Sequence, residues 1–126
     1  NHTYHHVQVT SLPLDQACEE IQKTSDLIES LTGKGTEYVR PPFGTWSEGL
    51  EDRLNLIPVM WTIDTLDWTT ENVDEIVCRV TEQAEENGII LMHDGYESTV
   101  QALERFIPLL EAEGYEFVTV DQVIMD

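Results

Sequence analysis

Two histidines near the start of the sequence, and an aspartate and a histidine further along, have the types and spacing that metal and proton chemistry require. His2 and His6 are four residues apart. On a helix or turn this spacing puts both imidazoles on one face, where they could bind one metal ion. Asp67 and His93 each come shortly after an apolar run. A carboxylate beside an imidazole favours its protonated form, so an Asp–His pair can act as a general acid near neutral pH.

Each of these residues also has an ordinary structural interpretation. A terminus rich in histidine can be a frayed end, and His5 could pair with His2 in place of His6 if the segment is extended. A lone His93 is more often a core or surface histidine, and a lone Asp67 is more often a helix cap. The functional interpretation therefore depends on whether the chain brings these residues to one place.

The elements that must position these residues alternate between helices and strands. Apolar residues at helical spacing predict helices over residues 14–31, 73–86 and 98–113, the last opened by a capping box at Ser98–Gln101. Apolar runs predict strands over residues 37–40, 57–63, 89–92 and 116–120. A short helix is predicted between the first two strands, and another begins at Asp121.

This alternation predicts an α/β fold with parallel strands and outer helices. A complete (β/α)8 barrel takes about 250 residues, so four strands in 126 residues predict part of a barrel or a small open sheet. In such folds chemistry collects at the carboxyl ends of the strands. There the sequence has Arg40, then Asp64 and Asp67, and then His93. A random acidic surface would not be expected to align in this way.

The composition excludes several other classes of protein. With 6 basic and 25 acidic residues the formal net charge is −19, which disfavours binding to nucleic acid or to an anionic membrane. There is no apolar run of about 18 residues that would insert into a membrane. Cys18 and Cys78 are too few for a disulfide scaffold, and we expect two small buried apolar side chains, with a disulfide between them left open.

The segments around these residues resemble motifs of the polysaccharide deacetylases, family four of the carbohydrate esterases. Residues 2–6 (HTYHH) are similar to the second of five ordered motifs, a His, a Ser or Thr, two free positions and a His. The third motif, Arg-x-Pro-aromatic, resembles residues 40–43 (RPPF), and the fourth, Asp-x-x-Asp-Trp, resembles residues 64–68 (DTLDW). Residues 91–93 (LMH) resemble the fifth motif, Leu-x-His. The four motifs occur in the family's order and cover essentially the whole chain.

The family's first motif, an Asp-Asp pair after the first strand, has no counterpart in the sequence. The resemblance therefore implies that residues 1–126 are the C-terminal portion of one polysaccharide deacetylase catalytic domain, part of a distorted (β/α) barrel. The general base and the third metal ligand would come from an N-terminal fragment of the same domain, which would be a partner of this chain. A genuinely truncated homologue is the alternative.

The resemblance implies a catalytic role for five residues. His2 and His6 would bind a divalent metal ion, zinc first and another transition metal second. His93 would protonate the leaving amine, and Asp67 would orient His93 and keep it charged. Arg40 would hold the general base by a charged hydrogen bond.

The resemblance also implies how the substrate is held. The backbone N–H of Phe43, where the family usually has Tyr, would stabilise the tetrahedral oxyanion. The side chains of Trp68 and Leu91 would wall the pocket for the acetyl methyl group. Asp64 is expected to be structural, and His5 is expected to be a bystander.

The activity implied is metal-dependent hydrolysis of N-acetyl groups from polysaccharide that contains N-acetylglucosamine, with release of acetate. Peptidoglycan is the first substrate candidate and chitin oligomers the second, which implies an extracellular or cell-envelope location. An acetylxylan esterase is the alternative enzyme, because the same site cleaves esters. A non-catalytic glycan-binding module on the same fold is the alternative of another class. An acidic α/β domain whose motifs are coincidental is the third interpretation.

Overall fold

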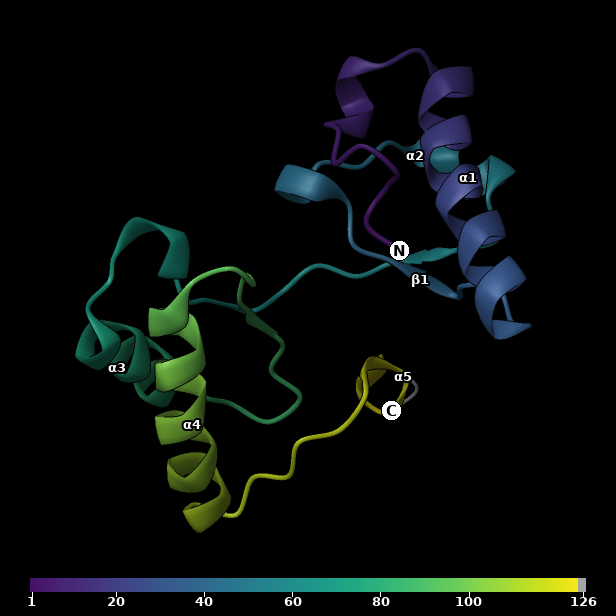
Figure 1. Cartoon of the computed structure of the whole chain (residues 1–126). Coiled ribbons are helices and arrows are strands. Elements are labelled where there is room, and N and C mark those ends of the chain that lie inside the picture. The colour runs from purple at the N-terminus through teal and green to yellow at the C-terminus, as the bar shows by residue number, and fades with distance from the viewer. Residues whose placement is uncertain (125–126) are drawn as a thin grey trace. The chain divides into compact units, whose positions relative to one another are not determined.

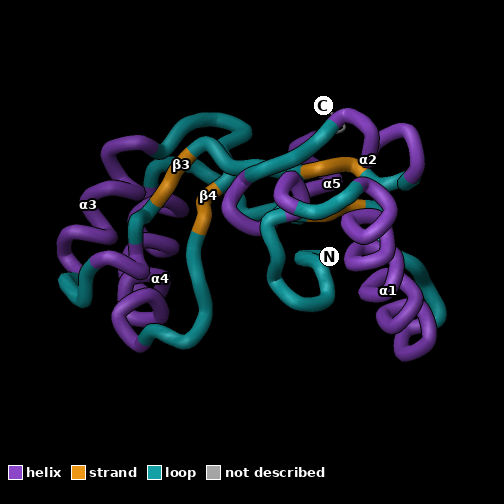
Figure 2. The backbone as a smooth tube through the Cα atoms, turned by 90° about the horizontal axis from the view of Figure 1, so that it is seen from above, coloured by secondary structure: helices purple, strands orange, loops and turns teal. Residues whose placement is uncertain are grey.

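The computed structural model describes residues 1–124 and divides the chain into two compact units, Asn1–Met60 and Trp61–Asp126 (Figure 1). The elements of the first unit are η1 (Val9–Ser11), α1 (Leu14–Thr32), β1 (Tyr38–Val39), η2 (Pro42–Gly44), α2 (Glu48–Arg53) and β2 (Ile57–Pro58). Those of the second unit are β3 (Ile63–Asp64), η3 (Asp67–Thr69), α3 (Val73–Gln83), β4 (Ile90–Leu91), α4 (Glu97–Ala112) and α5 (Val120–Ile124). Both units combine helices with short strands (Figure 2).

The core of the first unit forms under α1. Ala17 and Ile21 are four residues apart on one face of this helix and are both buried. The other buried apolar residues of this cluster are Val9, Val39, Leu50 and Leu54. The helix ends at Gly33, whose φ of 79° is the left-handed conformation that glycine adopts at low cost. The predicted helix over residues 14–31 is thus confirmed.

Strands β1 and β2 pair in parallel, with Val39 opposite Pro58. The N–H groups of Ile57 and Val59 donate to the carbonyls of Glu37, just before β1, and Val39 at 3.0 and 2.8 Å. Pro58 lies between these two donors, at the position whose backbone nitrogen is not needed by the ladder. A proline is therefore tolerated in this strand.

The core of the second unit lies between α3 and α4, which run side by side (Figure 1). From α3, Ile76 and Val80 are buried at a spacing of four residues. From α4, Ala102, Phe106 and Leu110 continue the same spacing. Strands β3 and β4 pair in parallel, with Asp64 opposite Leu91. Both strand pairs are therefore parallel, as the alternation of helices and strands predicts.

The prediction of one strand over residues 57–63 is wrong. The segment forms two short strands that pair with different partners. Val59 donates to β1, whereas the N–H groups of Thr62 and Ile63 both donate to the carbonyl of Ile89, at 2.9 and 3.0 Å. The apolar run continues across this change of partner, so hydropathy alone does not reveal it.

Three further expectations fail. Residues 116–119 form no strand, and α5 begins at Val120. The capping box does not form, because α4 begins at Glu97 and Ser98 lies inside the helix. Both cysteines are free thiols, and neither is buried as expected, because Cys18 is half-buried and Cys78 is exposed.

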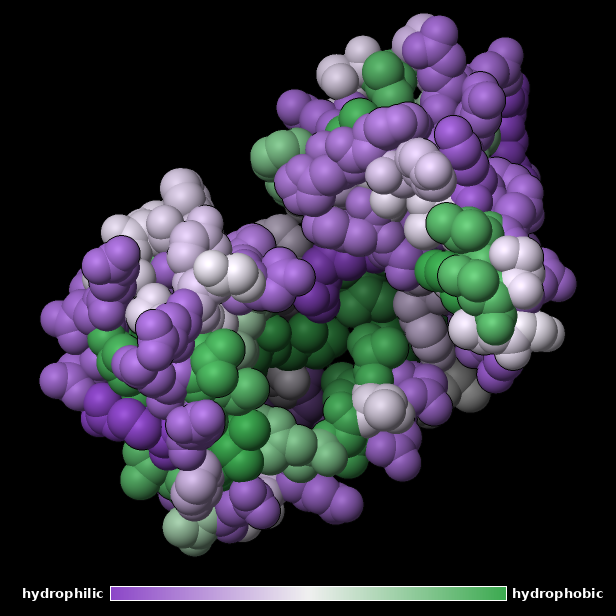
Figure 3. Space-filling view, viewed as in Figure 1, coloured by the Kyte–Doolittle hydropathy of each residue, from purple (hydrophilic) through white to green (hydrophobic). Residues whose placement is uncertain are grey.

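On the face seen in Figure 3, hydrophilic residues cover much of both units, with hydrophobic residues exposed among them. Among the described residues, no helix combines the length and the hydrophobicity needed to cross a membrane.

Candidate functional site

The two predicted metal ligands of this chain, His2 and His6, are neighbours in the first unit. The ring centroids of His2 and His6 are 4.9 Å apart, in an edge-to-face arrangement. The segment between them is a turn, in which Thr3 and His6 have φ values of 64° and 55°. The Thr3 hydroxyl accepts a hydrogen bond of 3.2 Å from the N–H of Val7 and closes this turn. The spacing of four residues thus brings the rings together on a strained turn and not on a helix.

The ring of His2 is oriented by the backbone of Arg40. Its Nδ1 lies 2.5 Å from the carbonyl oxygen of Arg40, which accepts a hydrogen bond from it. Burial lowers the pKa of His2, and the nearby His6 and Arg40 add to this effect, against the raising effect of the hydrogen bond. A neutral imidazole with its proton on Nδ1 presents the Nε2 lone pair, which is the form that binds metal ions.

Glu20 on α1 holds this turn from outside the motif. Its carboxylate accepts hydrogen bonds from the N–H of His5 at 2.8 Å and from the ring Nδ1 of His5 at 2.6 Å. Its backbone carbonyl accepts from the N–H of Tyr4 at 3.1 Å. Burial would raise the pKa of Glu20, but the two hydrogen bonds from His5 outweigh it and lower the pKa. His5 therefore has a structural role, which the sequence did not indicate.

Arg40 and Phe43 follow β1 and lie beside the histidine turn. The N–H of Arg40 donates to the carbonyl of Asn1 at 2.8 Å. Its guanidinium donates to the carbonyls of Val59 at 3.3 Å and Met60 at 3.2 Å. Burial lowers the pKa of Arg40 from its ordinary value.

Phe43 is 68% exposed and has a φ of 61°, a conformation that residues with a side chain rarely adopt. Its ring centroid is 5.1 Å from that of His6. The first unit thus brings together four of the predicted site residues: His2, His6, Arg40 and Phe43.

The second unit brings together Asp67 and His93. Asp67 begins the turn η3 that follows β3, and His93 follows β4. Asp67 Oδ1 lies 2.7 Å from Nδ1 of His93, and Oδ2 accepts a hydrogen bond of 2.7 Å from the N–H of His93. Oδ2 also accepts a hydrogen bond of 2.9 Å from the hydroxyl of Thr99. Asp67 is 1% exposed and accepts from three donors, whereas the side chain of His93 is 42% exposed, so the predicted Asp–His pair joins a buried carboxylate to a solvent-accessible ring.

The ionisation of Asp67 follows from these contacts. Burial would raise its pKa, but the hydrogen bonds from the His93 ring, the His93 N–H and Thr99 together lower it. An ionised Asp67 accepts a hydrogen bond from a protonated Nδ1. This contact fixes the tautomer of His93 and leaves its Nε2 free of this partner.

The remaining predicted residues of the second unit differ in their exposure. Trp68 is 59% exposed, so its ring is open to solvent. Leu91 is partly buried, and its carbonyl accepts a hydrogen bond of 2.7 Å from Thr65. Asp64 accepts a hydrogen bond of 3.0 Å from the N–H of Leu66 and so stabilises the turn, as a structural residue would.

Left-handed backbone conformations gather in the motif segments. Among the described residues, five that are not glycine have a positive φ: Thr3, His6, Phe43, Leu66 and Asn87. The first four lie within or between the residues of the motifs. Each such conformation costs about 1–3 kcal/mol, and such strain concentrates at functional sites.

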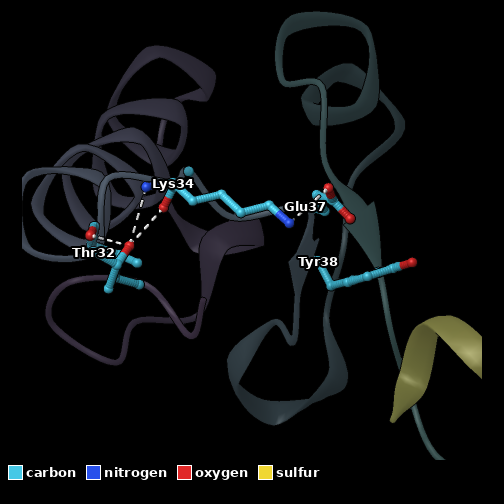
Figure 4. A pocket seen from close by; sticks show the side chains of 6 residues that line it. Thr32, Lys34, Glu37 and Tyr38 are labelled. Carbon is cyan, nitrogen blue, oxygen red and sulfur yellow. Dashed lines mark hydrogen bonds and ion pairs between the residues drawn. The ribbon is translucent and has the colours of Figure 1, made fainter.

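A shallow pocket lies between the end of α1 and β1 (Figure 4). In it the Thr32 hydroxyl contacts the backbone of Lys34, and the Lys34 ammonium lies 3.9 Å from Glu37. Neither the histidine turn nor the Asp–His pair contributes to its lining.

Residues 1–124 contain no group of three or more His, Cys, Asp or Glu side chains placed to hold a metal ion. His2 and His6 provide two neighbouring imidazoles, and His2 is oriented as zinc-ligating histidines usually are. These two residues therefore fit part of a catalytic metal site, which needs three protein ligands and an open position.

Comparison with known proteins gives a consistent result. The family described as Polysaccharide deacetylase matches residues 1–60. The chain is 35% identical over 123 residues to a peptidoglycan-N-acetylmuramic acid deacetylase, PdaC of Bacillus subtilis, a match that covers 98% of this chain and 26% of the relative. It is 30% identical, with the same coverage, to the peptidoglycan-N-acetylglucosamine deacetylase PgdA of Listeria monocytogenes. The chain thus spans about a quarter of the length of these relatives.

Solved structures show the same likeness. The structure of PdaC from Bacillus subtilis matches with a TM-score of 0.93 at 34% identity, over 99% of this chain and 62% of that one. BA3943, a pseudoenzyme of the CE4 family from Bacillus anthracis, matches with a TM-score of 0.85 at 32% identity, over 92% of this chain and 42% of that one. These matches confirm the predicted fold class, part of a (β/α)-barrel-like domain. The resemblance to the polysaccharide deacetylases, family 4 of the carbohydrate esterases, is thus confirmed over nearly the whole chain.

Proposed function

We propose that the protein containing this chain hydrolyses N-acetyl groups of a cell-wall glycan and releases acetate. The observation that carries the proposal is the buried Asp67 carboxylate, which binds both the N–H and the ring of His93. An amide is hard to cleave because its amine is a poor leaving group without a proton. A fixed imidazole with its outer nitrogen free is suited to supply that proton.

Each residue of the pair has its own part in this step. Asp67 keeps a proton on Nδ1 of His93 and stabilises the positive charge of the doubly protonated ring. Nε2 of His93 then transfers a proton to the nitrogen of the leaving amine. Burial of Asp67 strengthens this interaction, because water does not compete for its oxygens.

His2 and His6 are proposed to hold a divalent metal ion, zinc first and another transition metal second. When bound, the ion would polarise the acetyl carbonyl and lower the pKa of a water molecule. The proposed third ligand and the general base are an Asp-Asp pair from an N-terminal portion of the same domain, with residues 1–126 as its C-terminal portion. Arg40 would orient that base through the N–H groups that its contacts with Val59 and Met60 leave free.

Phe43, Trp68 and Leu91 are proposed to contact the substrate. Phe43 has a left-handed backbone conformation. Its backbone N–H is proposed to stabilise the oxyanion. The exposed ring of Trp68 and the side chain of Leu91 are proposed to contact the acetyl methyl group.

Peptidoglycan is the first proposed substrate, since the relatives PdaC and PgdA are named for its two N-acetylated sugars. Chitin oligomers are the second and acetylated xylan the third. A peptidoglycan substrate places the protein outside the cell or at the cell envelope. A non-catalytic module is the alternative of another class, and the likeness to the pseudoenzyme BA3943 favours it.

The deciding experiment measures acetate release by the full protein from peptidoglycan, chitin oligomers and acetylated xylan. We expect release from peptidoglycan, and the sugar that loses its acetyl group identifies the preferred residue. His93→Ala should lower turnover by about 10²–10⁴, the usual size of a general-acid effect, while bound metal is retained. If the wild-type protein binds peptidoglycan but releases no acetate, the non-catalytic interpretation is correct.

A further inference from the structure

Thr99 lies outside all four motif segments, yet its side chain contacts the candidate site. Its hydroxyl donates a hydrogen bond of 2.9 Å to Oδ2 of Asp67. The exposed fractions of the two residues are 3% and 1%. A buried hydroxyl bonded to a buried carboxylate is worth more than the same contact at a surface, because neither group has water as an alternative partner.

The two oxygens of Asp67 are shared among three donors. Two of them, the ring Nδ1 and the backbone N–H, belong to His93. Thr99 is the donor that comes from a separate element, the first turn of α4. The hydroxyl fixes Oδ2, and because a carboxylate is planar, it thereby also restricts where Oδ1 can lie.

The helix that carries Thr99 is itself firmly held. Thr99, Ala102 and Phe106 follow one another at spacings of three and four residues, so they share one face of α4. All three are buried, and the last two belong to the core between α3 and α4. The hydroxyl is therefore presented by the part of the helix that is packed against the core.

We infer that Thr99 is a positioning residue: it fixes the carboxylate of Asp67 so that Oδ1 holds the proton on Nδ1 of His93 and leaves Nε2 to act on the leaving amine. The action of Nε2 on the leaving amine rests on the proposed function. The fixing of the Asp67 carboxylate and of the His93 tautomer does not depend on it.

The test uses Thr99→Val, which keeps the branched shape and removes the donor. In the full protein kcat should fall about tenfold with KM unchanged, since one hydrogen bond to a charged group is lost. Thr99→Ser, which keeps the hydroxyl, should restore kcat. The matched control is Thr81→Val, because the hydroxyl of Thr81 bonds to carbonyls of its own helix α3. Thr99→Ala is the second variant if Thr99→Val does not fold.

A second readout separates positioning from a general loss of structure. In ¹⁵N-histidine-labelled protein, the ring nitrogens of neutral His93 should show the proton on Nδ1 in the wild type and in Thr99→Ser. In Thr99→Val they should show a mixture of tautomers. Wild-type kcat and spectrum in Thr99→Val would overturn the inference, and so would a lower kcat with an unchanged ring spectrum. If no form of the protein releases acetate, the proposed function fails, and the ring spectrum alone then decides the role of Thr99.

Discussion

On the proposed function, replacing Asp67 by Asn should remove most of the acetate release while leaving the fold and the proposed metal-binding histidines in place. The substitution keeps the size of the side chain but exchanges one acceptor oxygen for an NH₂ group. In the wild type the two oxygens accept from three donors, the ring and the N–H of His93 and the hydroxyl of Thr99. An amide can accept with one atom only, so at least one of these donors must lose its contact or become an acceptor.

The geometry indicates which contact changes. The N–H of His93 cannot change its role, so the amide oxygen should stay at the position of Oδ2. The NH₂ group then faces Nδ1 of His93, which must become an acceptor. The proton moves to Nε2, and the doubly protonated ring is disfavoured because NH₂ repels a protonated Nδ1. Loss of a correctly poised general acid corresponds to about 10²–10⁴ in kcat, with KM little changed.

The assay is acetate release from peptidoglycan by the full protein, with metal content measured on the same sample. Asp74→Asn is the matched control, because the carboxylate of Asp74 is exposed and pairs with Arg105 at the surface, where an ion pair contributes little. A kcat for Asp67→Asn within about threefold of the control would refute the role of the pair, since a general acid contributes far more than that.

The same variant tests the electrostatics of the buried carboxylate. The pKa of Asp67 is lowered from its ordinary value of 3.8 by its three hydrogen bonds, against burial. Between the folded-state pKa of Asp67 and its higher unfolded-state pKa, the unfolded chain binds more protons than the folded one. The ionised carboxylate therefore stabilises the fold above the unfolded-state pKa, and this stabilisation is lost as the pH falls through the folded-state pKa. Denaturant unfolding should therefore show Asp67→Asn as less stable than the wild type at neutral pH, with the difference narrowing below pH 3.8.

Two further predictions concern the histidine turn. His6→Ala should lose bound metal and acetate release together, as measured by metal analysis after dialysis; acetate release that survives without metal would reject the two histidines as ligands. Glu20→Gln should weaken metal binding about tenfold, the lower end of effects seen when a group that orients ligands is changed, because Glu20 holds His5 between the two ligands. The neighbouring Glu19 is exposed on the same helix, so Glu19→Gln should bind metal as the wild type does, and equal losses in the two variants would contradict the role of Glu20.

The helices were predictable because their signals are local. The apolar spacing in α1 and the glycine at its end lie within one stretch of sequence, and the structure places both as expected. The parallel pairing of strands was also predictable, since strands alternate with helices.

The strands themselves were predicted less well, because strand formation depends on a partner elsewhere in the chain. The apolar run from Ile57 to Ile63 gives no sign that its two ends pair with different strands. The predicted capping box at Ser98–Gln101 failed because α4 begins at Glu97, which places Ser98 inside the helix.

The pairing of Asp67 with His93 was predictable because both follow strands, and parallel strands place such residues at one edge. The contacts of Glu20 and Thr99 were not. They join residues that are 15 and 32 positions apart in the sequence, and nothing in the spacing of helical residues indicates which polar side chain meets a motif.

The contacts of Glu20 with His5 and of Thr99 with Asp67 suggest one way in which a protein with this fold can lose activity. The pseudoenzyme BA3943 is similar in structure to this chain, so the fold alone does not decide whether a member is active. Glu20 and Thr99 belong to helices whose buried faces form the two cores. A substitution in either core that shifts α1 or α4 would therefore move a group that holds a motif without altering any motif residue. On the proposed function, acetate release therefore needs His2, His6, Asp67 and His93 and, separately, the contacts of Glu20 and Thr99 that hold the motif residues in place.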